Sequence, residues 1–256
     1  MSAALQALPS VRDKVSKEEW QIRTDLAATY RLIAHHGWAD MIFTHLTARV
    51  PGPEHHFLIN PYGMMFDEIT ASSLVKIDVD GNKVMESPYP VNPAGFTIHS
   101  AIHMAREDAH AVIHVHTADG VAVSCQQQGL MPISQHAMLV HHDVAYHDYE
   151  GVALDHDERP RLVNDLGTKN LMILRNHGTL TVGHSCADAF LRLYNLDRAC
   201  TIQVRALSGG SKINQTNQGI PEKVAGQVGN MGGFADKLAW PGLLRLLDRK
   251  DPSYRN

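Results

Sequence analysis

Hydrophobic and polar positions along this chain follow a helical period in some stretches and a strand period in others. Apolar residues at helical spacing predict helices over 16–38, 92–108 (from about residue 95), 118–128, 156–167, 185–210 and 234–250. Ser16 and Glu19 have the spacing of a capping box, and Gly37 is suited to end the first helix. Helices therefore account for much of the predicted structure.

Strands are predicted between these helices. Alternating or continuously apolar residues indicate strands within 41–50, 56–63, 110–117 and 170–183, the last as two strands around a tight turn at 176–178. Thr70 is suited to cap a short helix, followed by a hairpin that turns at Asp80-Gly81, and the histidine-rich stretch 135–151 resembles a solvated loop. Because hairpins force antiparallel pairing, we expect an α/β fold with a mixed, mostly antiparallel sheet and helices on both faces.

The pattern also divides the chain. We expect one domain over residues 1–208, with 1–16 as an N-terminal extension. Residues 209–256 are expected to form a Gly-, Ser-, Asn- and Gln-rich linker and a helical tail, which packs on the domain or on a neighbouring subunit.

Composition narrows the function classes. The net charge of −4 and the lack of a Lys/Arg cluster argue against nucleic-acid binding, and no stretch has the apolar length that a membrane span needs. The start of the chain lacks the pattern of a secretory signal. Three widely spaced cysteines, Cys125, Cys186 and Cys200, fit free thiols in a reducing cytoplasm. We therefore expect a cytoplasmic globular protein.

The chain holds 17 histidines, and three of them have the spacing of metal ligands. His114 and His116 lie in the predicted strand "HAVIHVHT", where residues two apart point to the same face. His177 lies on the tight turn "RNHG" at a strand end. Three neutral imidazoles form a known zinc set that leaves a fourth position open, although iron, nickel, copper and cobalt also accept imidazole. The alternative is a polar pair on an exposed strand face.

The motifs "FTHLTARV", "FLINPYGMMFDEITASSLVKID", "NPAGFTIHSAIHMARED", "VIHVHTADGVAVSC" and "LRNHGTLTVG" together resemble the class II aldolase/adducin family over about residues 17–208. The resemblance implies a three-layer α/β/α domain and a homotetramer with active sites between subunits. It also implies a divalent metal held by His114, His116 and His177, usually Zn²⁺, with Mn²⁺, Fe²⁺ or Co²⁺ as alternatives.

One departure from the family is that Gly95 stands where its aldolases carry a glutamate that serves as acid/base, four residues before His99. Pro93 and Ala94 replace phosphate-binding serines, and His45 replaces an asparagine with the same role. The resemblance makes His45, Asn60, Gly63 and Gly95 the candidate substrate-binding residues.

Two residues are candidates for proton transfer in place of the glutamate. His136, allowing a one-residue insertion, falls near a tyrosine that family aldolases offer across the subunit interface; the alternative is a surface histidine. Glu68 is the second candidate, and its alternative role is to complement a helix dipole. His99 and His103 are spaced four apart on one helix, where we expect packing rather than metal binding.

The predicted function is that of a metal-dependent lyase. A three-histidine metal acts as a Lewis acid that stabilises an enediolate or enolate, which supports cleavage of a C–C bond in a small hydroxy-carbonyl or keto-acid substrate. Decarboxylation needs no base to start the bond cleavage, so both an aldolase-like and a carboxy-lyase reaction fit. The alternatives are a non-catalytic adducin-like assembly module and a metal-dependent oxygenase on the same fold.

Overall fold

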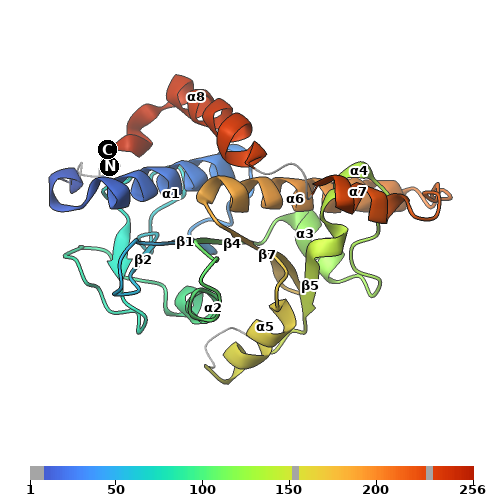
Figure 1. The fold of residues 1–256 in the computed structure, drawn as a ribbon, viewed down its shortest axis with the longest axis horizontal. Helices are drawn as coiled ribbons and strands as arrows, with labels where there is room; N and C mark the ends of the chain where they lie inside the picture. Colours follow the sequence, from blue (N-terminus) through green and yellow to red (C-terminus); the bar gives the residue numbers. More distant parts are fainter. Residues whose placement is uncertain (1–8, 152–155, 229–232) are drawn as a thin grey trace.

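Three layers make up the computed structural model, with helices on both faces of a central sheet (Figure 1). The structure describes residues 9–151, 156–228 and 233–256, without the side chains of 93–97, 156 and 228. The α/β/α fold class is as the sequence predicts.

The sheet has the strand order β3-β2-β1-β4-β7-β6-β5 among the described residues. Its only parallel pair there is β5 with β6, so the sheet is mostly antiparallel. Strands β4, β6 and β7 are buried along their whole length, because helices cover both faces of the sheet. The strands are β1 (His45–Arg49), β2 (Phe57–Ile59), β3 (Val75–Ile77), β4 (Ala111–Val115), β5 (Val144–His147), β6 (Leu171–Leu174) and β7 (Gly178–Gly183).

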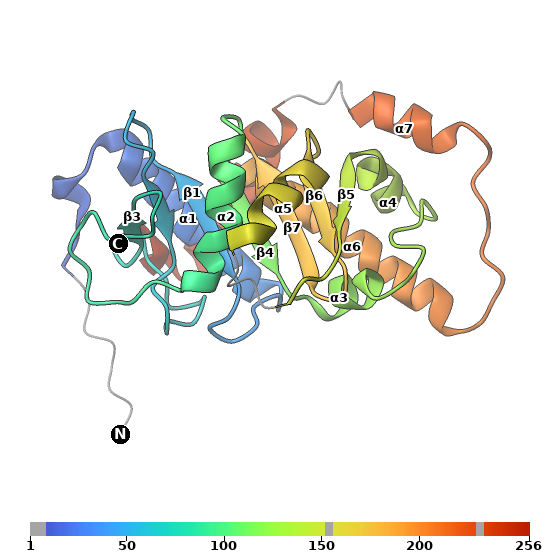
Figure 2. The same cartoon turned by 90° about the horizontal axis from the view of Figure 1, so that it is seen from below.

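One face of the sheet is covered by two helices, α2 (Pro93–Ala105) and α5 (Arg159–Leu166), which cross in front of the strands in Figure 2. Ile102 and Leu162 contribute to the apolar core beneath them. The opposite face is covered mainly by α1 (Lys17–His35) and α6 (Cys186–Ser208). The other α-helices are α3 (Ala118–Ser124), α4 (Gln135–Val140), α7 (Ile220–Val228) and α8 (Trp240–Lys250). The short helical segments are η1 (Arg12–Lys14), η2 (His141–Asp143), η3 (His156–Glu158), which leads into α5, the π-helix η4 (Ala235–Ala239) and η5 (Pro252–Arg255). None of the described helices is long and apolar enough to cross a membrane.

The prediction of a helix after Thr70 is wrong. The segment forms a single turn in which Thr70 Oγ1 accepts from the backbone N–H of Ser73, and the strand β3 follows directly. Apart from one bond within the turn, from the N–H of Ser73 to the carbonyl of Thr70, its backbone groups pair with distant partners: the N–H of Ala71 donates to the carbonyl of Tyr254, and Arg23 donates to the carbonyl of Leu74. Long-range contacts thus replace the helical hydrogen bonds that the local pattern predicts.

The prediction of a loop over residues 135–151 is also wrong in part. Residues Gln135–Val140 form α4, which Ser134 caps by accepting from the N–H of Ala137, and Val144–His147 form the edge strand β5. β5 depends on its parallel pairing with β6, a partner distant in sequence. The polar composition of this stretch concealed both elements.

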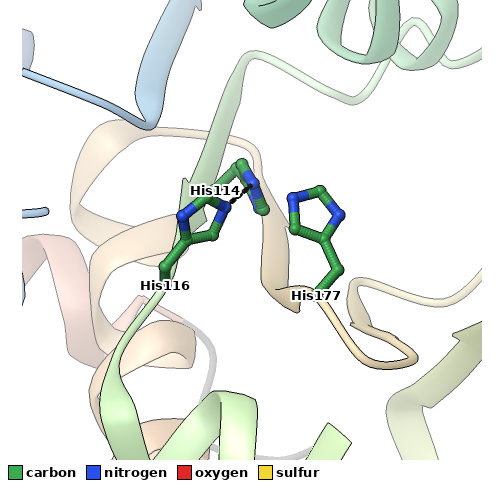
Figure 3. A group of neighbouring side chains, drawn as sticks. All are labelled: His114, His116 and His177. Carbon is green, nitrogen blue, oxygen red and sulfur yellow. Dashed lines mark hydrogen bonds between the residues drawn. The ribbon is translucent and has the colours of Figure 1, made fainter. Parts of the chain in front are cut away.

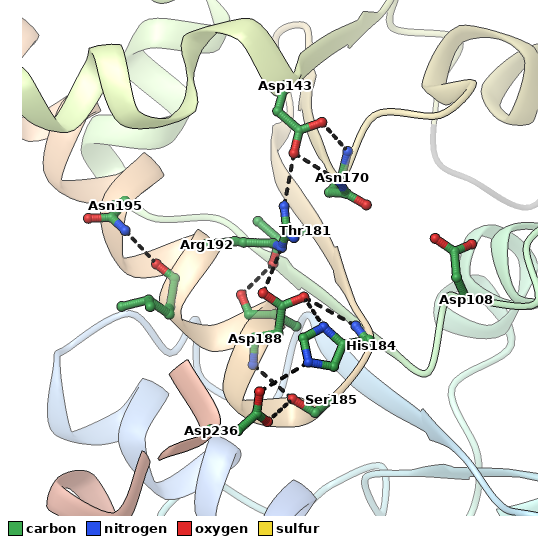
Figure 4. Close-up of polar contacts among 12 residues, drawn as sticks. Asp108, Asp143, Asn170, Thr181, His184, Ser185, Asp188, Arg192, Asn195 and Asp236 are labelled. Carbon is green, nitrogen blue, oxygen red and sulfur yellow. Dashed lines mark hydrogen bonds and ion pairs between the residues drawn. The ribbon is translucent and has the colours of Figure 1, made fainter. Parts of the chain in front are cut away.

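The C-terminal segment packs on α1 and on the start of α6. The indole N–H of Trp240 donates to Asp25, Arg31 pairs with Asp251, and Tyr254 is fully buried. Figure 4 shows the contacts at the start of α6, where Ser185 donates to Asp236. The C-terminal segment therefore joins the same apolar core as α1 through Ala235, Trp240, Leu247 and Tyr254.

Candidate metal centre

Three histidine side chains meet where β4 ends (Figure 3). His114 lies in β4, His116 follows its last residue, and His177 lies on the turn between β6 and β7. The ring centroids are 4.7 Å apart for His114 and His116, 4.8 Å for His114 and His177, and 4.9 Å for His116 and His177. One ligand nitrogen from each ring lies within 4.8 Å of the others.

Hydrogen bonds fix which nitrogens of the first two rings carry a lone pair. His114 Nδ1 lies 3.0 Å from the carbonyl oxygen of Thr179, which only accepts, so Nδ1 carries the proton. His116 Nδ1 lies 3.1 Å from the carboxylate of Asp40 and donates to it in the same way. In the neutral rings both Nε2 atoms are then acceptors, and they lie 2.9 Å apart. Two lone pairs at this distance fit a bound cation, and the anchored outer nitrogens are typical of metal-ligating histidines.

The turn before β7 positions the third ring. Asn176 has a positive φ of 58°, and its N–H donates to the carbonyl of Ser124. At Gly178 an added Cβ atom would lie 2.6 Å from the carbonyl oxygen of Val115, so the turn comes this close to β4 only because residue 178 is glycine. The sequence N-H-G therefore combines a residue with left-handed backbone (Asn176), a candidate ligand (His177) and a glycine that permits close approach to β4 (Gly178).

Burial keeps the rings of His114 and His177 neutral. It is the main cause that lowers the pKa of His177 to about 4, with His116 as the second cause. Burial likewise lowers the pKa of His114 well below its usual value, and the neighbouring His177 adds to this. Because neutral imidazole is the form that binds metals, the site is ready to accept a divalent ion at neutral pH.

Two of the four candidate substrate-binding residues lie buried with an unpartnered polar atom. His45 pairs in register with His114, its ring centroid lies 5.5 Å from that of His114, and its Nε2 has no hydrogen-bond partner. Burial is the main cause that lowers the pKa of His45 to about 3. Asn60 Oδ1 lies 3.0 Å from the hydroxyl oxygen of Tyr30, whose single proton also has the carbonyl of Leu46 within reach at 2.6 Å, and Asn60 Nδ2 has no partner. Such atoms fit groups that await a ligand or water.

Gly63 and Gly95 are less defined by the structure. Gly63 is exposed, with a φ of 105° and no heavy atom within 4 Å of an added Cβ. Gly95 lies within α2, one turn before His99, and its surroundings lie outside the described residues. The roles given to both remain predictions.

The two candidates for proton transfer have no contact with the three histidines among the described hydrogen bonds. His136 lies half-exposed on α4, and Glu68 accepts from the backbone N–H of Met65 within a turn. The helix dipole that Glu68 was expected to complement does not exist here, because no helix follows. A role for His136 across a subunit interface remains a prediction.

Sequence reasoning did not identify two polar residues near the site. Asp40 precedes the first strand in a loop and orients His116, 76 positions away. Thr47 Oγ1 lies 2.7 Å from both His99 Nδ1 and His103 Nε2, so the latter two pack against β1 as expected. No local pattern marks either residue. A cavity of about 570 Å³ lies elsewhere, between α4, α6 and residues 233–236.

Comparison with known proteins assigns the chain to a family. The model of the class II aldolase and adducin N-terminal domain matches residues 24–204. The chain belongs to this family.

Similar proteins carry either aldolase or adducin names. The chain is 58% identical over 251 residues to a protein of Caulobacter vibrioides named as a class 2 aldolase protein, covering 97% of this chain and 98% of the other. It is 47% identical over 195 residues to alpha-adducin of Mus musculus, covering 75% of this chain but 26% of that much longer protein.

Solved structures of the class II aldolase family share the whole fold. A crystal structure of an aldolase II superfamily protein from Pseudomonas syringae has a TM-score of 0.92 and 52% identity, covering 97% of this chain and 100% of the other. L-fuculose 1-phosphate aldolase from Glaciozyma antarctica has a TM-score of 0.81 and 26% identity, covering 99% and 97%.

Proposed function

We propose that this class II aldolase family member is a metal-dependent lyase that cleaves a C–C bond in a small hydroxy-carbonyl or keto-acid substrate. The observation that carries the proposal is the facing pair of Nε2 atoms on His114 and His116, 2.9 Å apart, each with its outer nitrogen anchored. His177 completes a set of three imidazoles whose ligand nitrogens lie within 4.8 Å of one another. Such a set suits Zn²⁺ above all, with Mn²⁺, Fe²⁺ and Co²⁺ as alternatives.

A divalent ion in this set supplies a Lewis acid for charge that develops on a substrate oxygen during C–C cleavage. The protein's own groups then have three tasks. Asp40 and the carbonyl of Thr179 hold the rings of His116 and His114 in the ligating tautomer. His45 and Asn60 offer unpartnered polar atoms to the substrate. Tyr30 keeps Asn60 in place through its hydroxyl.

The absence of a carboxylate at Gly95 decides which lyase reactions fit. Decarboxylation fits because it needs no base to begin. Aldol cleavage fits if another group removes the proton, and we assign that role to His136 of a neighbouring subunit in a homotetramer, with Glu68 as the second candidate. The similarity to L-fuculose 1-phosphate aldolase supports lyase chemistry on this fold.

A second candidate function is a non-catalytic assembly module. The 47% identity to alpha-adducin favours it, since that identity spans most of the chain. The two candidates differ in one property: only a lyase depends on the metal for turnover.

Turnover after metal removal separates them. Protein loaded with Zn²⁺ is screened against 2-keto acids, hydroxy-carbonyl compounds and sugar phosphates, before and after treatment with EDTA. We expect cleavage of at least one compound, loss on EDTA treatment, and a loss of at least about a hundredfold in His116→Ala. His110→Ala, at an exposed histidine, serves as the matched control. No turnover in any class, or equal turnover after EDTA, would contradict the proposal.

A further inference from the structure

A buried chain of hydrogen bonds runs from Ala109, just before β4, through His103 of α2 and Thr47 of β1 to His99 of α2, beside the three histidines. His103 Nδ1 lies 2.7 Å from the carbonyl oxygen of Ala109, and Thr47 Oγ1 bridges His103 Nε2 and His99 Nδ1 at 2.7 Å each. His99 and His103 are 0% and 1% exposed, and burial is the main cause that lowers the pKa of each far below its usual value. Both rings are therefore neutral, with one donor and one acceptor each.

The direction of every bond in this chain follows from its first member. A carbonyl only accepts, so His103 Nδ1 is the donor and its Nε2 the acceptor. The hydroxyl of Thr47 then donates its single proton to His103 Nε2 and accepts from His99 Nδ1. His99 Nε2 is left as a lone pair, buried and without a partner.

Only one unpartnered ring is adjacent to that lone pair among the described residues. The ring centroid of His45 lies 4.2 Å from that of His99 with a 53° tilt, and Nε2 of His45 is likewise buried and unpartnered. If the His45 ring rotates so that its Nε2–H points at Nε2 of His99, both buried atoms gain a hydrogen-bond partner.

We propose that His99 positions His45 by accepting a hydrogen bond from its Nε2–H, so that Nδ1 of His45 accepts a hydrogen bond from a substrate hydroxyl. His45 faces the metal centre, since it pairs in register with His114. In this arrangement His99 and Thr47 are positioning residues, and of these three residues only His45 contacts the substrate. The substrate named in this inference rests on the proposed function, whereas the protonation state of the three rings does not.

The charge around His45 suits the same class of substrate. Burial is the main cause that lowers the pKa of His45, and the neighbouring groups that add to it are His116 and His177 rather than a lysine or an arginine. Within the single chain, His45 thus offers an acceptor nitrogen, which suits an uncharged hydroxyl better than a phosphate dianion. We take the part of the substrate at His45 to be an unphosphorylated hydroxyl group.

The state of the rings is tested first, without any substrate. Two-bond ¹H–¹⁵N spectra of Zn²⁺-loaded protein labelled in histidine read which nitrogen carries the proton. We expect protonation at Nδ1 for His103 and His99 and at Nε2 for His45. Protonation of His45 at Nδ1, or of His99 at Nε2, would overturn the proposal. Because this reading needs no turnover, it stays valid if the lyase function itself fails.

Binding is tested with hydroxyacetone and its isostere 2-butanone, which lacks the hydroxyl, by saturation-transfer NMR on Zn²⁺-loaded protein. The wild type and Thr47→Ser are expected to prefer hydroxyacetone, and Thr47→Val to lose about fivefold of that preference, the effect of one hydrogen bond. A general loss of structure would weaken both ligands equally, so the ratio isolates positioning. Equal preference in Thr47→Val and Thr47→Ser, no binding of hydroxyacetone to the wild type, or displacement of hydroxyacetone by equimolar inorganic phosphate would overturn the proposal.

Discussion

At the scale of single residues, Gly178 sets the distance between the third histidine and the other two. An added Cβ atom there would lie 2.6 Å from the carbonyl oxygen of Val115 and 3.0 Å from Cδ2 of His116. A backbone carbonyl does not move as a flexible side chain does. Any side chain at 178 must therefore push the turn that holds His177 away from β4.

Gly178→Ala is expected to weaken Zn²⁺ binding by about ten- to a hundredfold, in the range found when the support of a ligand is disturbed. Overpacking should also lower the free energy of unfolding by about 1–3 kcal/mol. Competition with a chelating dye measures the affinity. Gly226→Ala is the control, because an added Cβ there has no heavy atom within 4 Å. Equal affinity in both variants would contradict the role of Gly178.

His103 makes stability depend on pH. Burial lowers its pKa to about 3 in the folded protein, below the usual 6.5. As pH falls below 6.5 the unfolded chain binds a proton that the folded protein refuses, so the free energy of unfolding decreases until about pH 3. The stability is thus fully present above pH 6.5 and is lost on acidification.

His103→Gln should make the fall in unfolding free energy between pH 6 and pH 4 shallower by about 1 kcal/mol per pH unit. Urea unfolding at several pH values measures this slope. His110→Gln, at an exposed position, is the control. An unchanged slope in His103→Gln would show that His103 is charged in the folded protein.

Sequence reasoning located the three candidate ligands but not the residues that orient the histidines. The two-residue spacing of His114 and His116, and the turn at His177, are local patterns, and the structure brings these three rings together. Asp40 and Thr47 were missed because they act on histidines 76, 52 and 56 positions away. A single sequence does not encode such pairs in any local period.

At the scale of elements, long amphipathic helices and buried strands followed from their periods, whereas short elements did not. The helices α1 and α6 have 19 and 23 residues, enough turns for an apolar face to repeat. β5 has four residues and exists through its pairing with β6, and the turn after Thr70 is held by Tyr254 and Arg23. Tertiary partners decide such short segments.

The docking of the C-terminal helix gives a prediction at this scale. Trp240→Phe keeps the aromatic ring but removes the N–H that donates to Asp25, 3.0 Å away. Asp25 is largely buried, and burial is the main cause that raises its pKa, so loss of a donor should lower the free energy of unfolding by about 1–3 kcal/mol.

Chemical denaturation measures the effect, with Leu238→Ala as the control because Leu238 is 65% exposed. Zn²⁺ content should stay the same in both variants, since the contact joins α8 to α1 rather than to the histidines. Equal stability of Trp240→Phe and the wild type would mean that this hydrogen bond does not hold the segment.

At the scale of the whole molecule, the strand order gathers the site. β4 lies between β1 and β7, so His114 has His45 on one neighbouring strand and the His177 turn beside the other. The antiparallel hairpin of β6 and β7 returns that turn to the end of β4 (Figure 2). Sequence order alone predicted antiparallel pairing, but not which strand would become the neighbour of β4.

We expect a homotetramer in solution, because His136, the residue proposed to remove the proton, has no described contact with the candidate metal centre of its own chain. Light scattering should give a mass of four 28.3 kDa chains. Mixed tetramers of His136→Ala and His116→Ala chains should regain part of the turnover that each variant lacks. A monomeric protein, or no recovery on mixing, would contradict a shared site.

The central claim is that His114, His116 and His177 hold one divalent ion. Mass spectrometry of metal content, after loading with Zn²⁺ and removal of free ions, tests it most directly. The account predicts about one Zn²⁺ per chain in the wild type and in the control His110→Ala, and less than about a tenth of that in His116→Ala and His177→Ala. Equal Zn²⁺ in all four proteins, or none in the wild type, would contradict it.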